Sequence, residues 1–208
     1  MNHIVLLGDS IFDNAAYVGN GPDVIRQLRA MLPQGWRATL NAMDGAAIED
    51  IRTQLGRMPG DASHLVLSVG GNDALLEAGV IEERARSTAA ALDRLAEVRD
   101  RFERNYHTML GEVRARMLPT AVCTIYDARF PDADQRRRAA VALTTLNDCI
   151  TREVFAHELT LIDLRLVCDE DTDFANPIEP SAHGGAKIAR AIAGFAAGAP
   201  ARSSVIAR

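Results

Sequence analysis

Short apolar runs alternate with longer amphipathic stretches along the whole chain. The runs have the length and the continuous apolar character of strands that are buried on both faces of a parallel sheet. They fall at residues 3–8, 36–42, 64–70, 120–126 and 159–163. The pattern therefore predicts five short strands, each separated from the next by helical sequence.

The stretches between these runs carry apolar residues at helical spacing. The first predicted helix begins at Gly21-Pro22-Asp23, with Pro22 at its first position, and Pro33 ends it. In the longest stretch, apolar residues lie among charged ones, which predicts either two helices or one helix broken near Asp100. Ser181 is the expected N-cap of the last helix. The remaining helical stretches are 46–57, 75–118, 133–156 and 181–197.

Regular alternation of strand and helix predicts an α/β fold, a three-layer α/β/α sandwich around a five-stranded, mostly parallel sheet. A chain of 208 residues fits one domain, which we expect to span residues 1–197, followed by a flexible tail at 198–208. In such sheets ligands bind at the carboxyl ends of the strands. Polar residues directly after strands are therefore the candidates for chemistry.

Composition excludes several classes of function. The chain is 48% hydrophobic and 25% charged with a formal charge of -5, so it lacks the basic excess of a nucleic-acid binder. Cys123, Cys149 and Cys168 are widely spaced and have no clustered histidine beside them, which predicts reduced structural thiols and no metal or cofactor. No signal segment or membrane span is recognisable, so we expect a cytoplasmic protein.

Three strand ends carry residues suited to acyl transfer. Ser10 follows the first strand in Gly8-Asp9-Ser10, where a glycine permits a tight exit and the hydroxyl can face the carboxyl-end cleft. Asn72 follows the third strand, and its side-chain amide could donate to an oxyanion. Gly45 follows the second strand, where its backbone N–H is a natural anion donor. Each could alternatively be an ordinary turn residue.

Taken in chain order, these three places resemble the GDSL or SGNH hydrolase family. Gly8-Asp9-Ser10 matches its first block, Gly45 its second, and Gly70-Gly71-Asn72-Asp73 its third. The resemblance implies a flavodoxin-like sandwich with Ser10 as nucleophile. It also implies an oxyanion hole made of the Ser10 N–H, the Gly45 N–H and the Asn72 side chain, and an ester as substrate.

The last block departs from the family pattern of Asp-x-x-His followed by proline. Alignment on Pro180 puts Asn176 at the aspartate position and Glu179 at the histidine position. Two residues could serve as the base in place of the missing histidine. His183, in the first turn of the last helix, could be the base, oriented by Glu179, Asp163 or Asp173. Glu179 itself could be the base if burial raises its pKa.

The leading interpretation is an ester hydrolase that forms an acyl-Ser10 intermediate without metal or cofactor. Its substrate could be a short acyl ester, an acetylated sugar or a lipid, and the insertion at 75–118 is the expected specificity element. A binding protein that has lost its base is the rival, and a nucleotide-binding sandwich is disfavoured because no phosphate-loop motif is present. Oligomeric state is left open by the sequence.

Three further residues, Asp13, Asn14 and Arg129, are candidates for roles near the site. Asp13 and Asn14 could shape the pocket or cap the turn that follows Ser10. Arg129, after the fourth strand, could meet an acidic group of the substrate, although a salt bridge within its loop is the favoured interpretation. Asp163 and Arg165 are expected to form an internal ion pair, and His3, His64, His107 and His157 are assigned no function.

Overall fold

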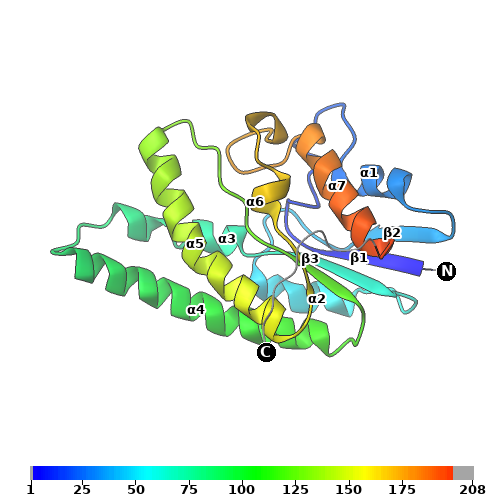
Figure 1. Cartoon of the computed structure of the whole chain (residues 1–208), viewed down its shortest axis with the longest axis horizontal. Coiled ribbons are helices and arrows are strands. Elements are labelled where there is room, and N and C mark those ends of the chain that lie inside the picture. The colour runs from blue at the N-terminus through cyan, green and yellow to red at the C-terminus, as the bar shows by residue number, and fades with distance from the viewer. Residues whose placement is uncertain (1, 199–208) are drawn as a thin grey trace.

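A single parallel sheet forms the centre of the molecule (Figure 1). The computed structural model describes residues 2–198. Within them, five strands lie in the order β2-β1-β3-β4-β5 and every neighbouring pair is parallel. The strands are β1 (Asn2–Gly8), β2 (Trp36–Leu40), β3 (His64–Ser68), β4 (Thr120–Cys123) and β5 (Thr160–Ile162). The predicted five-stranded sheet is thus confirmed, with all of its strands parallel.

Helices cover both faces of this sheet, as predicted. They are α1 (Val24–Met31), α2 (Ile51–Gly56), α3 (Gly71–Leu76), α4 (Thr88–Arg114), α5 (Ala133–Ala156), α6 (Leu164–Val167) and α7 (Ala182–Ala196). Three 3₁₀ turns are η1 (Ile48–Asp50), η2 (Ala78–Glu82) and η3 (Asp171–Asp173). Helices α1, α6 and α7 pack on one face, whereas α2, α4 and α5 pack on the other.

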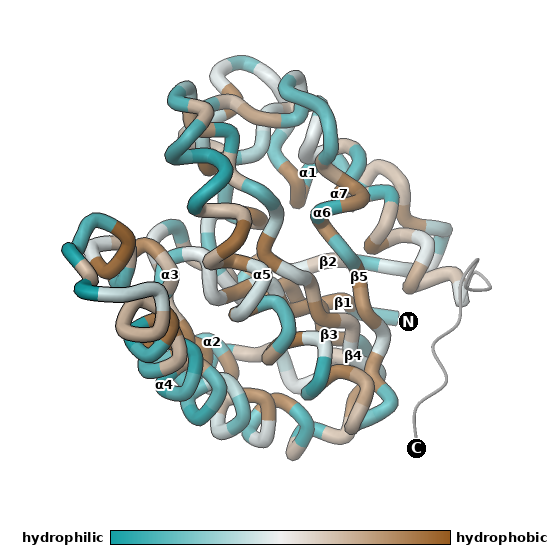
Figure 2. The backbone as a smooth tube through the Cα atoms, turned by 60° about the vertical axis from the view of Figure 1, so that its left-hand side comes forward, coloured by the Kyte–Doolittle hydropathy of each residue, from teal (hydrophilic) through white to brown (hydrophobic). Residues whose placement is uncertain are grey.

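Alternate residues of β1 supply the two cores. Ile4 and Leu6 point into the core beneath α1 and α7, and Val5 and Leu7 point into the core beneath α2, α4 and α5. All four are fully buried. Much of the central sheet is accordingly brown in Figure 2, whereas hydrophilic residues recur along the outer helices. This packing fixes where the carboxyl end of β1 lies, and with it the position of Ser10.

The longest insertion differs from its prediction. No break occurs near Asp100, because α4 is one helix from Thr88 to Arg114. Ser87 caps its start by accepting the Ala90 N–H at 3.1 Å, and Arg99 pairs with Glu103 one turn later. Charged residues at this spacing support a helix instead of interrupting it. Before α4, the insertion contains the end of α3 and the 3₁₀ turn η2.

The start of the first helix differs from its prediction, whereas the cap of the last helix agrees with its prediction. The first helix begins at Val24, with Asp23 as N-cap accepting the Arg26 N–H, so Pro22 precedes the cap instead of opening the helix. Ser181 caps α7 as predicted, by accepting the N–H groups of His183 and Gly184. Of the predicted tail at 198–208, all but Gly198 lies outside the described residues.

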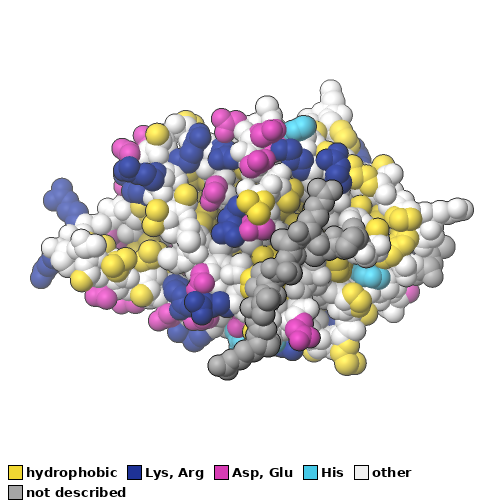
Figure 3. All heavy atoms as spheres, viewed as in Figure 1, with side chains coloured by type: hydrophobic (Ala, Val, Ile, Leu, Met, Phe, Trp, Pro, Cys, Tyr) yellow, Lys and Arg dark blue, Asp and Glu magenta, His cyan; other side chains and the backbone are white. Residues whose placement is uncertain are grey.

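One face of the molecule carries both charged and hydrophobic side chains. Basic and acidic side chains are interspersed over the face seen in Figure 3. None of the helices among residues 2–198 combines the length and the apolar character needed to cross a bilayer.

Candidate active site

Ser10 lies on a tight turn that leaves β1 at the carboxyl edge of the sheet. Gly8 has a φ of 135°, and a side chain there would meet the Ser68 carbonyl of β3, so only glycine fits. The buried amide of Gln54 holds both backbone groups of Gly8: its Oε1 accepts the Gly8 N–H at 2.7 Å and its Nε2 donates to the Gly8 carbonyl at 2.8 Å. Ser10 follows two residues later and is 6% exposed.

The loop that carries Gly45 lies beside this turn. The Met43 N–H donates to the Gly8 carbonyl at 3.0 Å, and the Asp44 N–H donates to the Asp13 carboxylate at 3.0 Å. Gly45 itself has a φ of 78°, in the left-handed region that favours glycine. Asp13 therefore shapes the site by tethering this loop, which is one of the two roles predicted for it.

Asn72 reaches the same loop from the start of α3. Its Nδ2 donates to the Ala46 carbonyl at 2.9 Å, which leaves the second hydrogen of this amide free for another acceptor. The neighbouring Asp73 accepts the Ile48 N–H at 3.1 Å and so fixes the far end of the loop. In the described part of the chain, the N–H groups of Ser10 and Gly45 have no hydrogen-bond partner.

Glu179 contacts Ser10 directly. The Ser10 hydroxyl donates to Oε1 of Glu179 at 3.1 Å, across a sequence separation of 169 residues. Glu179 is 6% exposed, and its second oxygen is buried without a hydrogen-bond partner among the described residues. The structure thus brings Ser10 together with the residue that stands at the histidine position of the family pattern.

A compact loop at 174–180 presents Glu179. The side chain of Asn176 accepts the N–H groups of Ile178 and Glu179 at 2.9 and 3.0 Å, which closes a tight turn. The Tyr126 hydroxyl donates to the Ile178 carbonyl at 2.7 Å, and Asn14 donates to the Pro180 carbonyl at 3.1 Å. Asn14 therefore connects the Ser10 turn to the Glu179 loop.

His183 lies outside this group. Its side chain is 59% exposed, and its Nε2 is 3.7 Å from Asp173 and 3.8 Å from Glu170. It lies in the first turn of α7 as predicted, but the carboxylates near it are those of Asp173 and Glu170, and the Ser10 hydroxyl is hydrogen-bonded to Glu179. Asp163, another predicted orienting residue, pairs with Arg165 at 2.6 Å, which is the internal ion pair expected there.

Two buried carboxyl groups belong to this region, that of Glu179, which accepts from the Ser10 hydroxyl, and that of Asp9, the residue before Ser10. Burial raises the pKa of Glu179 above its ordinary value, the hydrogen bond from Ser10 opposes this, and repulsion from Asp44 adds to it. Burial also raises the pKa of Asp9 to about 8, although the hydrogen bond from the Ile11 N–H opposes the shift. Both buried carboxyl groups therefore hold a proton to a higher pH than an exposed carboxyl group would.

A cavity of about 390 Å³ opens beside Ser10, Asn72 and Glu179. Its wall is largely apolar and comes from α3, η2, α4 and α5. Typical contributors are Leu75, Val80, Leu95, Val98, Ala139, Ala142, Leu143 and Leu146. Residues of the 75–118 insertion thus form much of this wall.

The interpretation of Arg129 from the sequence agrees with the structure, whereas two residues that support the site were not predicted. Arg129 makes loop contacts, with Nε 3.4 Å from Asp171 and a hydrogen bond to the Asp169 carbonyl, which agrees with the salt bridge favoured from the sequence. Gln54 and Tyr126 were missed as supports of the site. A polar residue inside an apolar helix face was the signal for Gln54, since it had to find a buried partner.

Solved structures with the same fold are enzymes that act on esters. An extracellular lipase from Streptomyces rimosus aligns with a TM-score of 0.66 at 17% identity, covering 96% of this chain and 100% of that one. A lipase from a goat rumen metagenome gives 0.72 at 17% identity, covering 94% and 98%. Est24, a carbohydrate acetylesterase from Sinorhizobium meliloti, gives 0.64 at 13%, covering 95% and 99%. These similarities show the fold, an α/β/α sandwich around a parallel sheet.

The family follows from the sequence itself. Residues 6–187 match the model of the GDSL-like lipase/acylhydrolase family. The chain belongs to this family, and the resemblance inferred from its three motifs is confirmed. No curated protein matches the sequence significantly.

Proposed function

We propose that the protein is a carboxylic-ester hydrolase in which Ser10 is the nucleophile and Glu179 is the general base. The observation that carries this proposal is the 3.1 Å hydrogen bond from the Ser10 hydroxyl to a buried Glu179 carboxylate. A base must lie within hydrogen-bond reach of the proton that it removes, and Glu179 meets this requirement. His183, held by other carboxylates, is assigned no part in the reaction.

The reaction would proceed through an acyl-enzyme. Glu179 takes the Ser10 proton as Oγ attacks the ester carbonyl, and the protonated Glu179 then returns that proton to the departing alkoxide. Glu179 then takes a proton from water as the water oxygen attacks the acyl-Ser10 carbonyl. It returns that proton to Ser10 Oγ as the carboxylic acid leaves. The raised pKa of Glu179 favours this role, because a carboxylate of ordinary pKa is too weak a base for a serine hydroxyl.

Three donors would stabilise the oxyanion. The unpartnered N–H groups of Ser10 and Gly45 and the second amide hydrogen of Asn72 are available for it. The contacts of the Gly45 loop with Gly8, Asp13 and Asn72 support this assignment, since they hold the donors before substrate arrives. Loss of one such donor typically costs about 10²–10³ in rate.

The cavity supports an apolar acyl group as the favoured part of the substrate. Its wall is mainly aliphatic, and the Ser10 hydroxyl lies at its edge beside Asn72. Burial of each methylene there would contribute about 0.8 kcal/mol. We therefore expect esters of medium-length fatty acids to be hydrolysed faster than acetyl esters.

Because the chain lacks the Asp-x-x-His motif, a second candidate function is the binding of an apolar ligand without catalysis. Labelling with a fluorophosphonate probe and hydrolysis of p-nitrophenyl butyrate separate the two. We expect labelling of the native chain, none of Ser10→Ala, and a fall in kcat of at least about 10²-fold in Glu179→Gln. Absence of both labelling and hydrolysis in the native chain would favour the binder.

His183→Ala is the matched control for the identity of the base. Its side chain is exposed and makes no contact with Ser10 in the described structure, so kcat should stay within about twofold of the native value. If His183→Ala lost activity while Glu179→Gln kept it, the role of Glu179 would have to be abandoned.

A further inference from the structure

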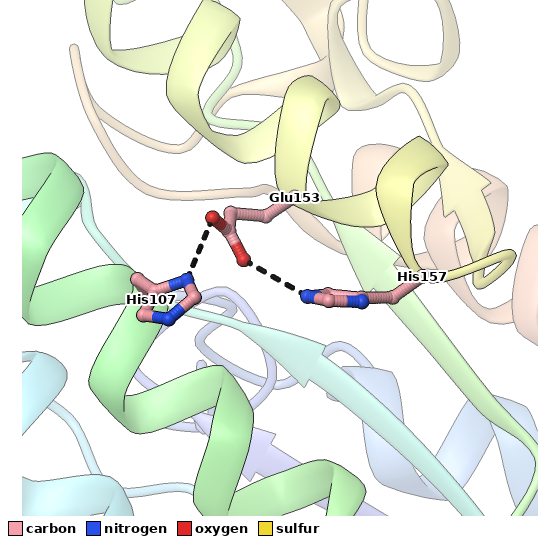
Figure 4. A group of neighbouring side chains, drawn as sticks. All are labelled: His107, Glu153 and His157. Carbon is pink, nitrogen blue, oxygen red and sulfur yellow. Dashed lines mark hydrogen bonds and ion pairs between the residues drawn. The ribbon is translucent and has the colours of Figure 1, made fainter. Parts of the chain in front are cut away.

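Two histidines and a glutamate meet where α4 packs against α5. His107 comes from α4, Glu153 from α5, and His157 from the residue that caps the end of α5 (Figure 4). Nδ1 of His107 is 2.9 Å from Oε1 of Glu153, and Nε2 of His157 is 3.4 Å from Oε2 of the same carboxylate. One ligand atom from each residue lies within 4.8 Å of the other two.

Glu153 has no stronger partner. Among residues 2–198, its carboxylate pairs with the two imidazoles and with no lysine or arginine. Its Oε2 is buried and lacks a hydrogen bond, and the side chain as a whole is 18% exposed. A buried carboxylate oxygen that makes no hydrogen bond costs free energy even beside an imidazole at 3.4 Å, and a bound cation would remove that cost.

The other cluster of this kind in the described chain shows the contrast. Glu170, Asp173 and His183 also place ligand atoms within 4.8 Å of one another. There, however, the ammonium of Lys187 lies 2.9 Å from Asp173 and 3.3 Å from Glu170, so a cation already occupies the position between the carboxylates. No such cation is provided at Glu153.

The three ligands suit a transition-metal ion. Zn²⁺ binds two histidine nitrogens and one carboxylate oxygen at about 2.0–2.2 Å and completes a tetrahedron with water. Tetrahedral bonds of that length separate the ligand atoms by roughly 3.3 Å. The ligand atoms of the three side chains already lie within 4.8 Å of one another, so the side chains need only draw closer together to bind the ion. The ring of His107 is 66% exposed, which gives the ion a path of entry and room for the water.

We propose that His107, Glu153 and His157 bind one Zn²⁺ ion, which fastens α4 to α5. The site is structural, because α5 ends where β5 begins and Ser10 lies at the opposite edge of the sheet, where β1 ends. The sequence did not reveal it, since His107 is 46 residues from Glu153 and only the packing of two helices brings them together.

Titration calorimetry of the untagged, chelator-treated full chain with Zn²⁺ tests the proposal. We expect one ion per chain, and a rise in Tm of roughly 5–10 °C when free Zn²⁺ is at 100 times its Kd. His107→Ala, Glu153→Gln and His157→Ala should each weaken binding at least about tenfold. Co²⁺ in place of Zn²⁺ should give the visible bands of a tetrahedral complex.

Two comparisons keep the result interpretable. His183→Ala should bind Zn²⁺ like the native chain, and His107→Cys should retain binding while giving Co²⁺ a thiolate charge-transfer band that the native chain lacks. Circular dichroism establishes that each variant is folded. Absence of saturable binding by the native chain, binding that survives both His107→Ala and His157→Ala, or binding lost in His183→Ala would overturn the proposal.

Discussion

At the scale of single residues, the environment of Glu179 decides whether a carboxylate can replace an imidazole. Imidazole has an ordinary pKa near 6.5 and glutamate one near 4.3, so an exposed glutamate is the poorer base at neutral pH. Burial of Glu179 reduces this difference by raising its pKa. Burial likewise raises the pKa of Asp9 to about 8, so this residue carries less negative charge at neutral pH than an exposed aspartate.

The pH profile of the esterase should report Glu179. The base must be ionised, so log kcat/KM should rise with pH through an apparent pKa above about 4.3 and then level off. Steady-state rates with p-nitrophenyl butyrate over a range of pH give this curve. His183→Ala should leave the rising limb in place, and a limb that vanishes in that variant would contradict the assignment.

Asp9 should make folding stability decrease toward alkaline pH. Its pKa is about 8 in the folded protein and near 3.9 in the unfolded chain, so between these values the folded state binds more protons. The stability that Asp9 contributes is therefore greatest at acid pH and is lost as pH rises through about 8. Asp9→Asn, which keeps the oxygen that accepts the Ile11 N–H, should flatten this dependence.

Urea denaturation at pH 5 and pH 9 measures the Asp9 effect. The native chain should lose a few kcal/mol of unfolding free energy relative to Asp9→Asn between the two conditions. Asp13→Asn is the control, because the Asp13 carboxylate accepts an exposed hydrogen bond from the Asp44 N–H, whereas Asp9 is buried. Parallel pH dependences for native protein and Asp9→Asn would show that Asp9 does not titrate as stated.

At the scale of elements, α2 holds the end of β1 through one side chain. Gln54→Leu would leave the Gly8 N–H buried without its acceptor, so we expect a loss of about 1–3 kcal/mol of unfolding free energy and a lower kcat. Arg52→Ala on the exposed side of α2 is the control and should stay within about 0.5 kcal/mol. Equal stability of the two variants would contradict this role for Gln54.

The pattern of apolar residues was sufficient to predict strands and most helices. Buried β1 and the amphipathic α7 with its Ser181 cap are specified by local sequence, and so is the position of Ser10 after a strand. The unbroken α4 was harder to predict, because Asp100 interrupts the apolar pattern without interrupting the helix.

The choice between Glu179 and His183 could not be made locally. Both are polar residues within five positions of each other, and contacts from distant residues such as Tyr126 and Asn14 help to hold the 174–180 loop with Glu179 beside Ser10. Such contacts join residues more than 50 positions apart. The spacing of residues along the sequence does not reveal these contacts. For this reason the sequence left both Glu179 and His183 as candidates for the base.

At the scale of the whole molecule, the cavity depends on how α3, α4 and α5 assemble over the sheet. Ala142→Phe should fill space for about two methylenes and so lower kcat/KM for p-nitrophenyl octanoate about tenfold or more. Activity on the acetate should change little. Val141→Phe, on the exposed side of the same helix, is the matched control. Equal losses on both esters would argue against an acyl-binding cavity.

The turn capped by Asn176 has an evolutionary consequence. An aspartate oxygen can accept the same two N–H bonds, so the turn can keep its shape with either residue at position 176. The position of Glu179 is likewise set by backbone contacts that do not depend on its side chain. The hydrogen bonds that shape this loop therefore do not themselves bar substitution at position 176 or 179, so the two positions could change one at a time.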